Sequence, residues 1–458
     1  MLKEEDMNRI AVYFRHRHER LAQLRGQAML RETDAAWLAR PTPRHTRKTF
    51  VCLPNTQLLY LFAGSFIISF TGLGLFPVLP VYATEFGASR TVIGLYFALM
   101  YAANAAGAVS TNRLAARLTH KGLFVTVGVL GIPALLLLGQ AMALWQVVVL
   151  TAALWFCGGA GLALISEFTA QQAGGASRGK SFSLMFLAFP LGAVFGGTLV
   201  GQLVNSAGYH AMFVVLGAVW AVLPAIGIFK LKVASDFSPA RTSSAQPGTA
   251  RLGATFYRVL AMTLLASIAI SIGRLGTALS MQTQDFSARA ISSTSTVSGL
   301  LTIPIVLLIG ALSDRLGRKT FLMLTNVLAG GGALLLAFAT DLWMFWIAAT
   351  LVLVALCTNG ALASALVTDT LSPQARQRGL PWINAMNPVA GVLSFASLGF
   401  LMDAFGQLPV YLAALTVAVG AALLLNSLQR ERPSVVTNAE VCETRNAAGQ
   451  PVPAGEAA

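Results

Sequence analysis

One arginine of the 458-residue chain lies deep inside a long apolar stretch, in the segment Ile270-Ser-Ile-Gly-Arg274-Leu-Gly. A charged side chain at bilayer depth costs at least about 2.5–3.5 kcal/mol on insertion scales, so such a residue is by default a functional candidate. We expect Arg274 to face a central cavity and to attract an anionic group. The alternatives are that it reaches the outer membrane–water interface or pairs with Asp285 or a helix end.

Two carboxylates, Glu167 and Asp369, lie about one helical turn from the ends of apolar stretches. We expect them to act in a gate, pairing with nearby arginines when one side of the membrane is closed. Those arginines are Arg113 and Arg117 for Glu167, and Arg315 and Arg318 for Asp369. Alternatively one of the two carboxylates carries a proton, because the sequence places no other carboxylate at middle depth. If neither does, any coupling is to something other than a proton.

Uncharged polar side chains at middle depth form a second candidate set. Amides buried in lipid usually bond to neighbouring helices, which is one interpretation of each of them. As a set, they are also suited to line a polar cavity around Arg274. The residues expected to line it are Tyr101, Asn104, Asn359, Asn384 and Asn387.

The chain that must position these residues has the composition of a membrane protein. It is 55% hydrophobic and 11% charged, with a mean hydropathy of +0.68, whereas soluble domains carry about 25% charged residues. From Leu58 onward, apolar runs of helix length alternate with short polar breaks. An all-α membrane protein of about twelve transmembrane helices is expected. The predicted spans are residues 58–83, 91–114, 122–141, 145–171, 180–203, 210–230, 256–281, 294–314, 319–339, 342–370, 380–403 and 408–428.

The basic residues are distributed asymmetrically about these spans. If the amino terminus is cytoplasmic, all of the 32 lysines and arginines except Arg90, Arg274 and Arg289 lie on the cytoplasmic side. The positive-inside rule predicts this bias, so both termini are expected in the cytoplasm. The net charge of +14 then faces anionic lipid headgroups. A nucleic-acid partner is not expected, because the basic residues form no patch interleaved with aromatic ones.

The chain divides into two halves with the same pattern. Cys157 and Arg178 recur about half a chain length later as Cys357 and Arg378, as in transporters built from internal repeats. Within residues 1–57, residues 7–30 are expected to form a basic amphipathic helix on the inner membrane surface. Alternatively, the segment is a disordered leader from an upstream start codon. The predicted domains are this basic cytoplasmic segment (1–57), a six-helix bundle (58–230), a cytoplasmic linker (231–255), a second six-helix bundle (256–428) and a disordered cytoplasmic tail (429–458).

The most specific motif lies between the eighth and ninth spans and reads Gly310-Ala-Leu-Ser-Asp314-Arg315-Leu-Gly317-Arg318-Lys319. Glycine permits a tight turn at a helix end, and the clustered charges can pair across moving helices. The motif resembles the G-x-L-[AS]-D-R-x-G-R-[RK] loop of the major facilitator superfamily at every position, and the resemblance covers roughly residues 55–430. The equivalent segment after the second span has Asn112 in place of the acid and lacks both glycines. A departure from the family's cytoplasmic latch is therefore expected in the first half.

Two further motifs resemble those of the drug:proton antiporter, or multidrug exporter, branch of that family. The first span ends in Pro77-Val-Leu-Pro80, similar to the P-V-x-P ending of twelve-helix exporters. The fifth span carries Gly192-Ala-Val-Phe-Gly196-Gly197, similar to the G-P-x-x-G-G antiporter motif with alanine in the proline's place. The resemblance implies that these residues let the helices bend and pack closely during alternating access.

The resemblance implies a secondary active transporter whose site lies between two bundles and opens alternately to either side. Export of a drug or metabolite is the first expectation, and a uniporter or exchanger for an organic anion bound through Arg274 is the alternative. A non-transporting membrane sensor or scaffold is a third interpretation. No enzyme activity, cofactor or metal site is expected, because the four cysteines are scattered and no nucleophile–base group appears. We expect a monomer in a bacterial inner membrane, with a small-molecule substrate, the lipid bilayer and, as an open alternative, a coupling proton as its partners.

Overall fold

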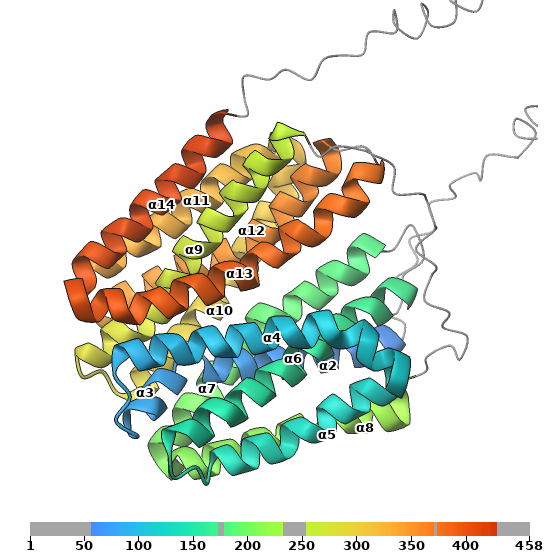
Figure 1. The fold of residues 1–458 in the computed structure, drawn as a ribbon, viewed down its shortest axis with the longest axis vertical. Helices are drawn as coiled ribbons and strands as arrows, with labels where there is room; N and C mark the ends of the chain where they lie inside the picture. Colours follow the sequence, from blue (N-terminus) through green and yellow to red (C-terminus); the bar gives the residue numbers. More distant parts are fainter. Residues whose placement is uncertain (1–55, 173–177, 232–252, 371–372, 428–458) are drawn as a thin grey trace, which may run out of the picture. The chain divides into compact units, whose positions relative to one another are not determined.

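The helices that carry the candidate residues are seen in a computed structural model, which describes residues 56–172, 178–231, 253–370 and 373–427 (Figure 1). All four ranges belong to one unit, Pro54–Ala458, and within them there are helices and turns but no β-strand. The predicted all-α membrane fold is confirmed. Nearly all of the basic segment 1–57, most of the linker 231–255 and the tail 429–458 lie outside the described residues.

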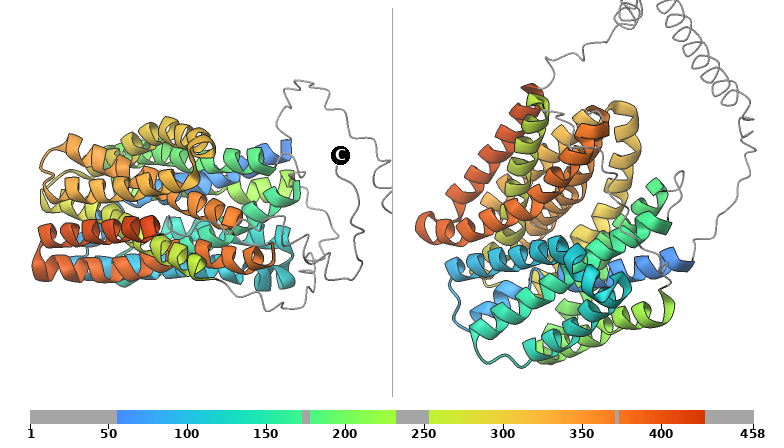
Figure 2. Two further views of the ribbon diagram at one scale, coloured as in Figure 1. Left: turned by 90° about the horizontal axis from the view of Figure 1, so that it is seen from above. Right: turned by 45° about the vertical axis from the view of Figure 1, so that its right-hand side comes forward.

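The helices form two groups along the chain, coloured blue to green and yellow-green to red in Figure 1. The first group, called the N-terminal bundle, comprises α2 (Thr56–Leu75), α3 (Leu79–Thr84), α4 (Arg90–Leu118), α5 (His120–Leu138), α6 (Leu144–Gln172), α7 (Arg178–Trp220), α8 (Val222–Ala225) and the π-helix Ile226–Lys230. The second group, called the C-terminal bundle, comprises α9 (Ala254–Thr283), α10 (Ala288–Leu316), α11 (Arg318–Ala337), α12 (Leu342–Thr370), α13 (Pro373–Phe405) and α14 (Gln407–Ser427). The long helices run roughly parallel to one another (Figure 2).

Eleven segments of the described chain are long and apolar enough to cross a bilayer. The longest, Leu184–Lys230, has 47 residues, about twice the length that one crossing needs. Gly208 interrupts its helical geometry with φ 77° and ψ 178°, and glycine adopts such a positive φ without a steric penalty. The predicted fifth and sixth spans are therefore joined by a kink instead of a loop. Counted as two, they complete the twelve predicted spans.

The first predicted span, 58–83, is two helices, since α2 ends at Leu75 and α3 begins at Leu79. Pro77 lacks an amide hydrogen and cannot continue the hydrogen-bond pattern of α2. Pro80 lies in the first turn of α3, where a proline ring is tolerated. The break leaves Phe76 outside both helices, and this residue becomes part of the candidate site.

The bundles have a linker end, where the 231–255 linker begins, and an opposite end. At the linker end, the side chain of Gln57 donates to the Lys230 carbonyl at 2.9 Å, next to the start of the linker. At the opposite end, Gln284 donates to the Ala339 carbonyl, also at 2.9 Å.

Most of the contact between the bundles is made by two helix pairs, α4 with α13 and α7 with α10. Glycines allow both pairs to approach closely, as is typical of helices that pack in a membrane. A Cβ atom on Gly94 of α4 would lie 3.1 Å from the Gly399 nitrogen of α13. A Cβ atom on Gly299 of α10 would lie 2.9 Å from the Val194 nitrogen of α7. Backbone therefore meets backbone where the two bundles touch.

Candidate functional site

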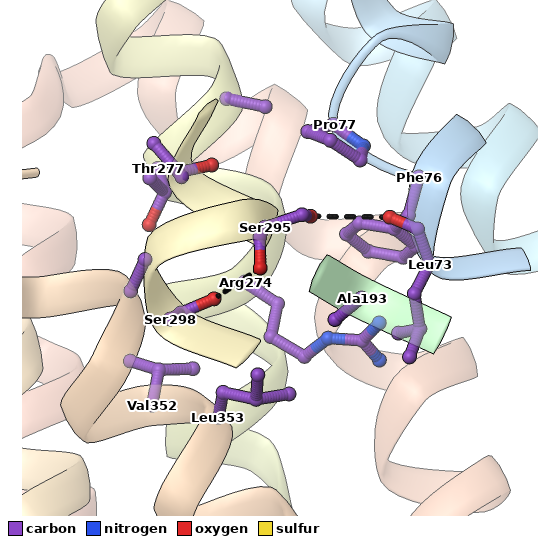
Figure 3. Close-up of a pocket in the computed structure, with 13 residues that line it drawn as sticks. Leu73, Phe76, Pro77, Ala193, Arg274, Thr277, Ser295, Ser298, Val352 and Leu353 are labelled. Atoms are coloured by element: carbon purple, nitrogen blue, oxygen red, sulfur yellow. Dashed lines mark hydrogen bonds between the residues drawn. The ribbon is translucent and has the colours of Figure 1, made fainter. Parts of the chain in front are cut away.

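Arg274 extends from α9 toward the N-terminal bundle (Figure 3). Its Cζ lies 4.0 Å from the centroid of the Phe76 ring, and its Nη1 donates a hydrogen bond to the Tyr101 hydroxyl. Because α9 ends at Thr283, Arg274 lies about 13 Å from the opposite end at 1.5 Å per residue. The guanidinium therefore contacts the other bundle at depth, instead of pairing with Asp285.

The positive charge of Arg274 has no acidic partner within 4.0 Å in the described part of the chain. The ion pairs found there join Arg90 to Asp403 and His120 to Glu167, well away from Arg274. A guanidinium presents five N–H donors, and the Tyr101 hydroxyl accepts from one of them. A half-buried cation without a counter-ion is costly, so a negative charge entering the site would be stabilised.

A small cavity of about 50 Å³ lies beside Arg274, with walls from both bundles (Figure 3). One part of the wall is apolar and includes Leu73, Ala193 and Leu353. The other part carries the hydroxyl groups of Thr277, Thr294, Ser295 and Ser298. Each hydroxyl donates its hydrogen to a backbone carbonyl at 2.7–3.2 Å, so its oxygen lone pairs remain available to a ligand that donates hydrogen bonds.

Four aromatic side chains pack together beside Arg274 and are called the aromatic plug: Phe76, Phe97, Tyr101 and Phe395. Phe395 comes from α13 and the other three from the N-terminal bundle. The Tyr101 and Phe395 rings meet edge to face at 4.8 Å, and the Phe76 and Phe97 rings do so at 5.1 Å. Phe97 and Phe395 are fully buried. The aromatic plug fills space between the bundles at about the level of Arg274.

Nearer the opposite end, Asp403 of α13 caps α4 across the two bundles. Its Oδ2 accepts hydrogen bonds from the Thr91 nitrogen at 3.0 Å and from the Thr91 hydroxyl at 2.7 Å. Its Oδ1 lies 3.9 Å from Arg90 Nη1. A carboxylate at a helix N-terminus satisfies free N–H groups and complements the helix dipole. This contact holds the two bundles together at the opposite end.

On the linker side of the aromatic plug, Asn384 and Asn387 lie on the same face of α13 as Gly391, because residues three, four and seven apart share a helix face. Gly391 packs directly against the Tyr101 ring. Asn384 and Asn387, by contrast, are exposed, and Asn384 Oδ1 accepts from Ser364 at 3.2 Å. These two amides therefore lie on the face of α13 that turns toward α4.

Two other predicted cavity residues point into the interior of their own bundles. Asn104 Nδ2 donates to the Trp155 carbonyl of α6 at 3.2 Å. Asn359 is 3% exposed, and its Nδ2 donates to Ser267 Oγ of α9 at 3.0 Å. The structure thus brings Tyr101 to Arg274 but gives Asn104 and Asn359 helix–helix hydrogen bonds, which is the alternative role of a buried amide.

At the linker end, the predicted gate carboxylate Glu167 has a histidine beside it. Glu167 Oε1 lies 3.3 Å from His120 Nε2, while Arg113 and Arg117 are exposed. His120 is the first residue of α5, directly after the helix-capping Thr119. The predicted partners of Glu167 were Arg113 and Arg117, and the structure places His120 beside it instead.

The 310–319 loop is partly described. Gly317 separates α10 from α11 with φ 94°, a conformation that favours glycine, and Arg318 begins α11. A Cβ on Gly310 would meet open space. The side chains of Asp314, Arg315 and Asp369 lie outside the described residues.

The glycines of the fifth-span motif pack α7 against two neighbours. A Cβ on Gly192 would lie 2.8 Å from the Ser69 Cβ of α2, and one on Gly196 would lie 3.2 Å from the Gly74 Cα. A Cβ on Gly197 would meet the Ser295 Cβ of α10 at 2.9 Å. Close packing of α7 brings the N-terminal bundle against the hydroxyl-bearing wall of the cavity.

Comparison with known proteins identifies the class to which this fold and site belong. The family model described as Major Facilitator Superfamily matches the chain twice, over residues 61–281 and 252–453. The chain therefore belongs to the major facilitator superfamily. It is an integral membrane protein and a secondary transporter of a small molecule, not an enzyme.

Three similar proteins differ in the molecules for which they are named. The class B tetracycline resistance protein of Escherichia coli is 32% identical over 107 residues, which make up 23% of this chain and only 26% of that protein. A putative tartrate transporter of Agrobacterium vitis is 24% identical over 433 residues, or 87% of this chain and 93% of that protein. The solved structure of the nucleoside transporter NupG superposes with a TM-score of 0.67 at 15% identity, over 82% of this chain and 100% of NupG. The likeness to NupG shows the fold alone.

Proposed function

We propose that the transported molecule is a small organic anion and that Arg274 binds its negative group. The observation that carries this proposal is the guanidinium itself, which lies deep in α9 with one hydrogen bond and no acidic partner within 4.0 Å among the described residues. Hydrogen bonds between a guanidinium and a carboxylate are charge-assisted and often bidentate. They are stronger in a low-dielectric interior than in water.

The wall of the cavity favours an anion that also carries hydroxyl groups. A carboxylate would accept from Arg274, while substrate hydroxyls would donate to Ser295 and Ser298, whose own hydrogens are already engaged. A hydroxy acid supplies both kinds of group, and the relative from Agrobacterium vitis is named for such a molecule, tartrate. The cavity of about 50 Å³ holds the anionic group, and a larger substrate would extend toward Asn384 and Asn387.

The proposed orientation places the linker end in the cytoplasm, following the asymmetry of the basic residues. The two bundles, 58–230 and 256–428, then move relative to one another about Arg274. The Asp403–Thr91 contact closes the outer side in the conformation described here. We assign closure of the inner side to a gate at the linker end. Within this gate, Glu167, which contacts His120, is the candidate proton carrier. The remaining proposed gate residues are Gly310, Asp314, Arg315, Gly317, Arg318, Asp369, Arg113 and Arg117.

Export of a lipophilic drug is the second candidate function. The local match to the tetracycline resistance protein and the resemblance of Gly192, Gly196 and Gly197 to the antiporter motif favour export. In an exporter of neutral or cationic drugs, the contact between Arg274 and Phe76 would serve only to hold the bundles together.

The test is a thermal-shift and uptake experiment with the purified full-length chain. Wild type, Arg274→Ala and Arg274→Lys are compared with Arg289→Ala, which removes an exposed arginine at the opposite end as a matched control. The probes are L-tartrate, succinate, tetraphenylphosphonium and tetracycline. We expect tartrate to stabilise wild type and Arg289→Ala, to stabilise Arg274→Lys less, and to leave Arg274→Ala unchanged. Uptake of labelled tartrate into proteoliposomes should follow the same order.

The opposite pattern would reject the anion proposal. If neither carboxylate stabilises wild type, while tetracycline or tetraphenylphosphonium stabilises wild type and Arg274→Ala equally, Arg274 is structural and drug export becomes the better conclusion. Equal tartrate flux in wild type and Arg274→Ala would also show that Arg274 is structural.

A further inference from the structure

We propose that Tyr101 is a positioning residue that holds Arg274 across the two bundles in the empty transporter and is displaced by the anionic group of the substrate. The inference rests on the proposed function, because it names the event that couples anion binding to movement of the bundles. Its structural part, the contact between Tyr101 and Arg274, can be tested without any ligand.

The Arg274–Tyr101 hydrogen bond connects α9 of the C-terminal bundle with α4 of the N-terminal bundle. The same guanidinium lies over the ring of Phe76, at the end of α2. One flexible side chain therefore makes two contacts with the other bundle at the level of the cavity. Phe76 lines that cavity but Tyr101 does not, so the Tyr101 hydrogen bond is the contact that is lost if the guanidinium turns toward a ligand there.

The Tyr101 ring is fixed and cannot follow such a movement. It packs edge to face against Phe395 of α13, with 4.8 Å between ring centroids. It also fills the space over Gly391, where a Cβ atom would lie 2.9 Å from Tyr101 Cε1. Because α13 holds the phenol in place, a rearrangement at this point has to come from the long side chain of Arg274.

A carboxylate competes successfully with the phenol for Arg274. The Tyr101 oxygen is a neutral acceptor of one hydrogen bond, whereas a carboxylate accepts two parallel charge-assisted bonds, each about twice as strong as a neutral one. A ligand shifts a conformational equilibrium only through a difference in its affinity for the two conformations. The Tyr101 bond provides this difference, because an anion must break the bond in the conformation that is closed at the opposite end.

The ligand-free test measures the distance between the bundles at the opposite end. Spin labels are placed at Met142 and Thr340, which are exposed there, in a chain whose four cysteines are replaced. A hydrogen bond contributes about 1 kcal/mol, so Tyr101→Phe should increase the population with separated labels by about three- to tenfold. Arg274→Ala should shift the population in the same direction, and the double variant should add nothing to Arg274→Ala, because the two residues share one interaction.

Tyr96→Phe is the matched control. The Tyr96 hydroxyl donates to Thr151 at 2.9 Å, between α4 and α6 of the same bundle, so its loss should leave the distance distribution unchanged. Additive effects of Tyr101→Phe and Arg274→Ala, or an equal effect of Tyr96→Phe, would overturn the inference.

The ligand-bound test titrates L-tartrate against the same variants. Tyr101→Phe should bind tartrate about three- to tenfold more tightly than wild type, since the competing acceptor is gone, and Tyr96→Phe should bind like wild type. Unchanged tartrate affinity in Tyr101→Phe, with binding lost in Arg274→Ala, would overturn displacement but leave the proposed function intact. Absence of anion binding in wild type would overturn the proposed function. The spin-label distances of the double variant, measured without ligand, would still show whether Tyr101 holds Arg274.

Discussion

Removal of the Asp403 carboxylate should open the opposite end of the transporter. Asp403 accepts two hydrogen bonds from Thr91, at 3.0 and 2.7 Å, at the start of α4. Fully buried bonds to a charged group would contribute about 1.5–3 kcal/mol each, but the Asp403 side chain is 37% exposed, and solvent weakens such contacts strongly. With the helix-dipole contribution included, we take about 1–2 kcal/mol for the whole contact. Asp403→Ala should therefore shift the equilibrium toward the open state by roughly 5- to 30-fold.

The assay for Asp403→Ala is the distance between spin labels at Met142 and Thr340. The long-distance population should rise in Asp403→Ala and stay at the wild-type level in Asp341→Ala, which removes an exposed carboxylate from the same end. A wild-type distribution in Asp403→Ala, or an equal shift in Asp341→Ala, would refute the reasoning that this contact joins the bundles.

Two further substitutions test close packing and backbone conformation. Gly399→Ala should abolish transport at normal expression, because the new Cβ would lie 2.9 Å from the Thr91 Cα and force α4 and α13 apart; Gly420→Ala, whose Cβ meets open space, should transport normally. Gly317→Ala should destabilise the protein by about 1–2 kcal/mol in thermal unfolding, because it forces a side chain into a left-handed conformation. Gly310→Ala, also in open space, should unfold like wild type, and equal stabilities would contradict the backbone argument.

Hydropathy was sufficient to place nearly every helix, because a bilayer imposes both a length and an apolar surface on each crossing. The predicted tenth span, 342–370, coincides with α12. The prediction was less accurate where the chain interrupts a helix without a polar loop. Gly208 interrupts the helical geometry inside an apolar run, and the break after Leu75 depends on where Pro77 falls relative to the end of α2. Neither the interruption at Gly208 nor the break at Pro77 changes the average hydropathy of its segment, so hydropathy does not predict them.

The sequence predicted how deep in the membrane the candidate residues lie. It did not predict toward which neighbouring helix each side chain points. Tyr101 and Asn104 lie at similar depth on α4, yet Tyr101 bonds to Arg274 while Asn104 bonds to α6. In water, an apolar stripe shows which side of a helix is buried, but lipid and protein interior are both apolar, so that signal is weak in a membrane. Phe76 and Phe395 were missed for the same reason. The proline break next to Phe76 was a signal that could have drawn attention to it.

Neither bundle alone contains the candidate site. Arg274 and the hydroxyl-bearing wall come from α9 and α10, while Tyr101, Phe76 and Leu73 come from the N-terminal bundle. A chain still being synthesised consequently has no complete candidate site until α9 and α10 have joined the membrane. A truncated first half would insert without acquiring a pathway for the substrate. We therefore expect that a chain interrupted before α9 cannot bind the substrate.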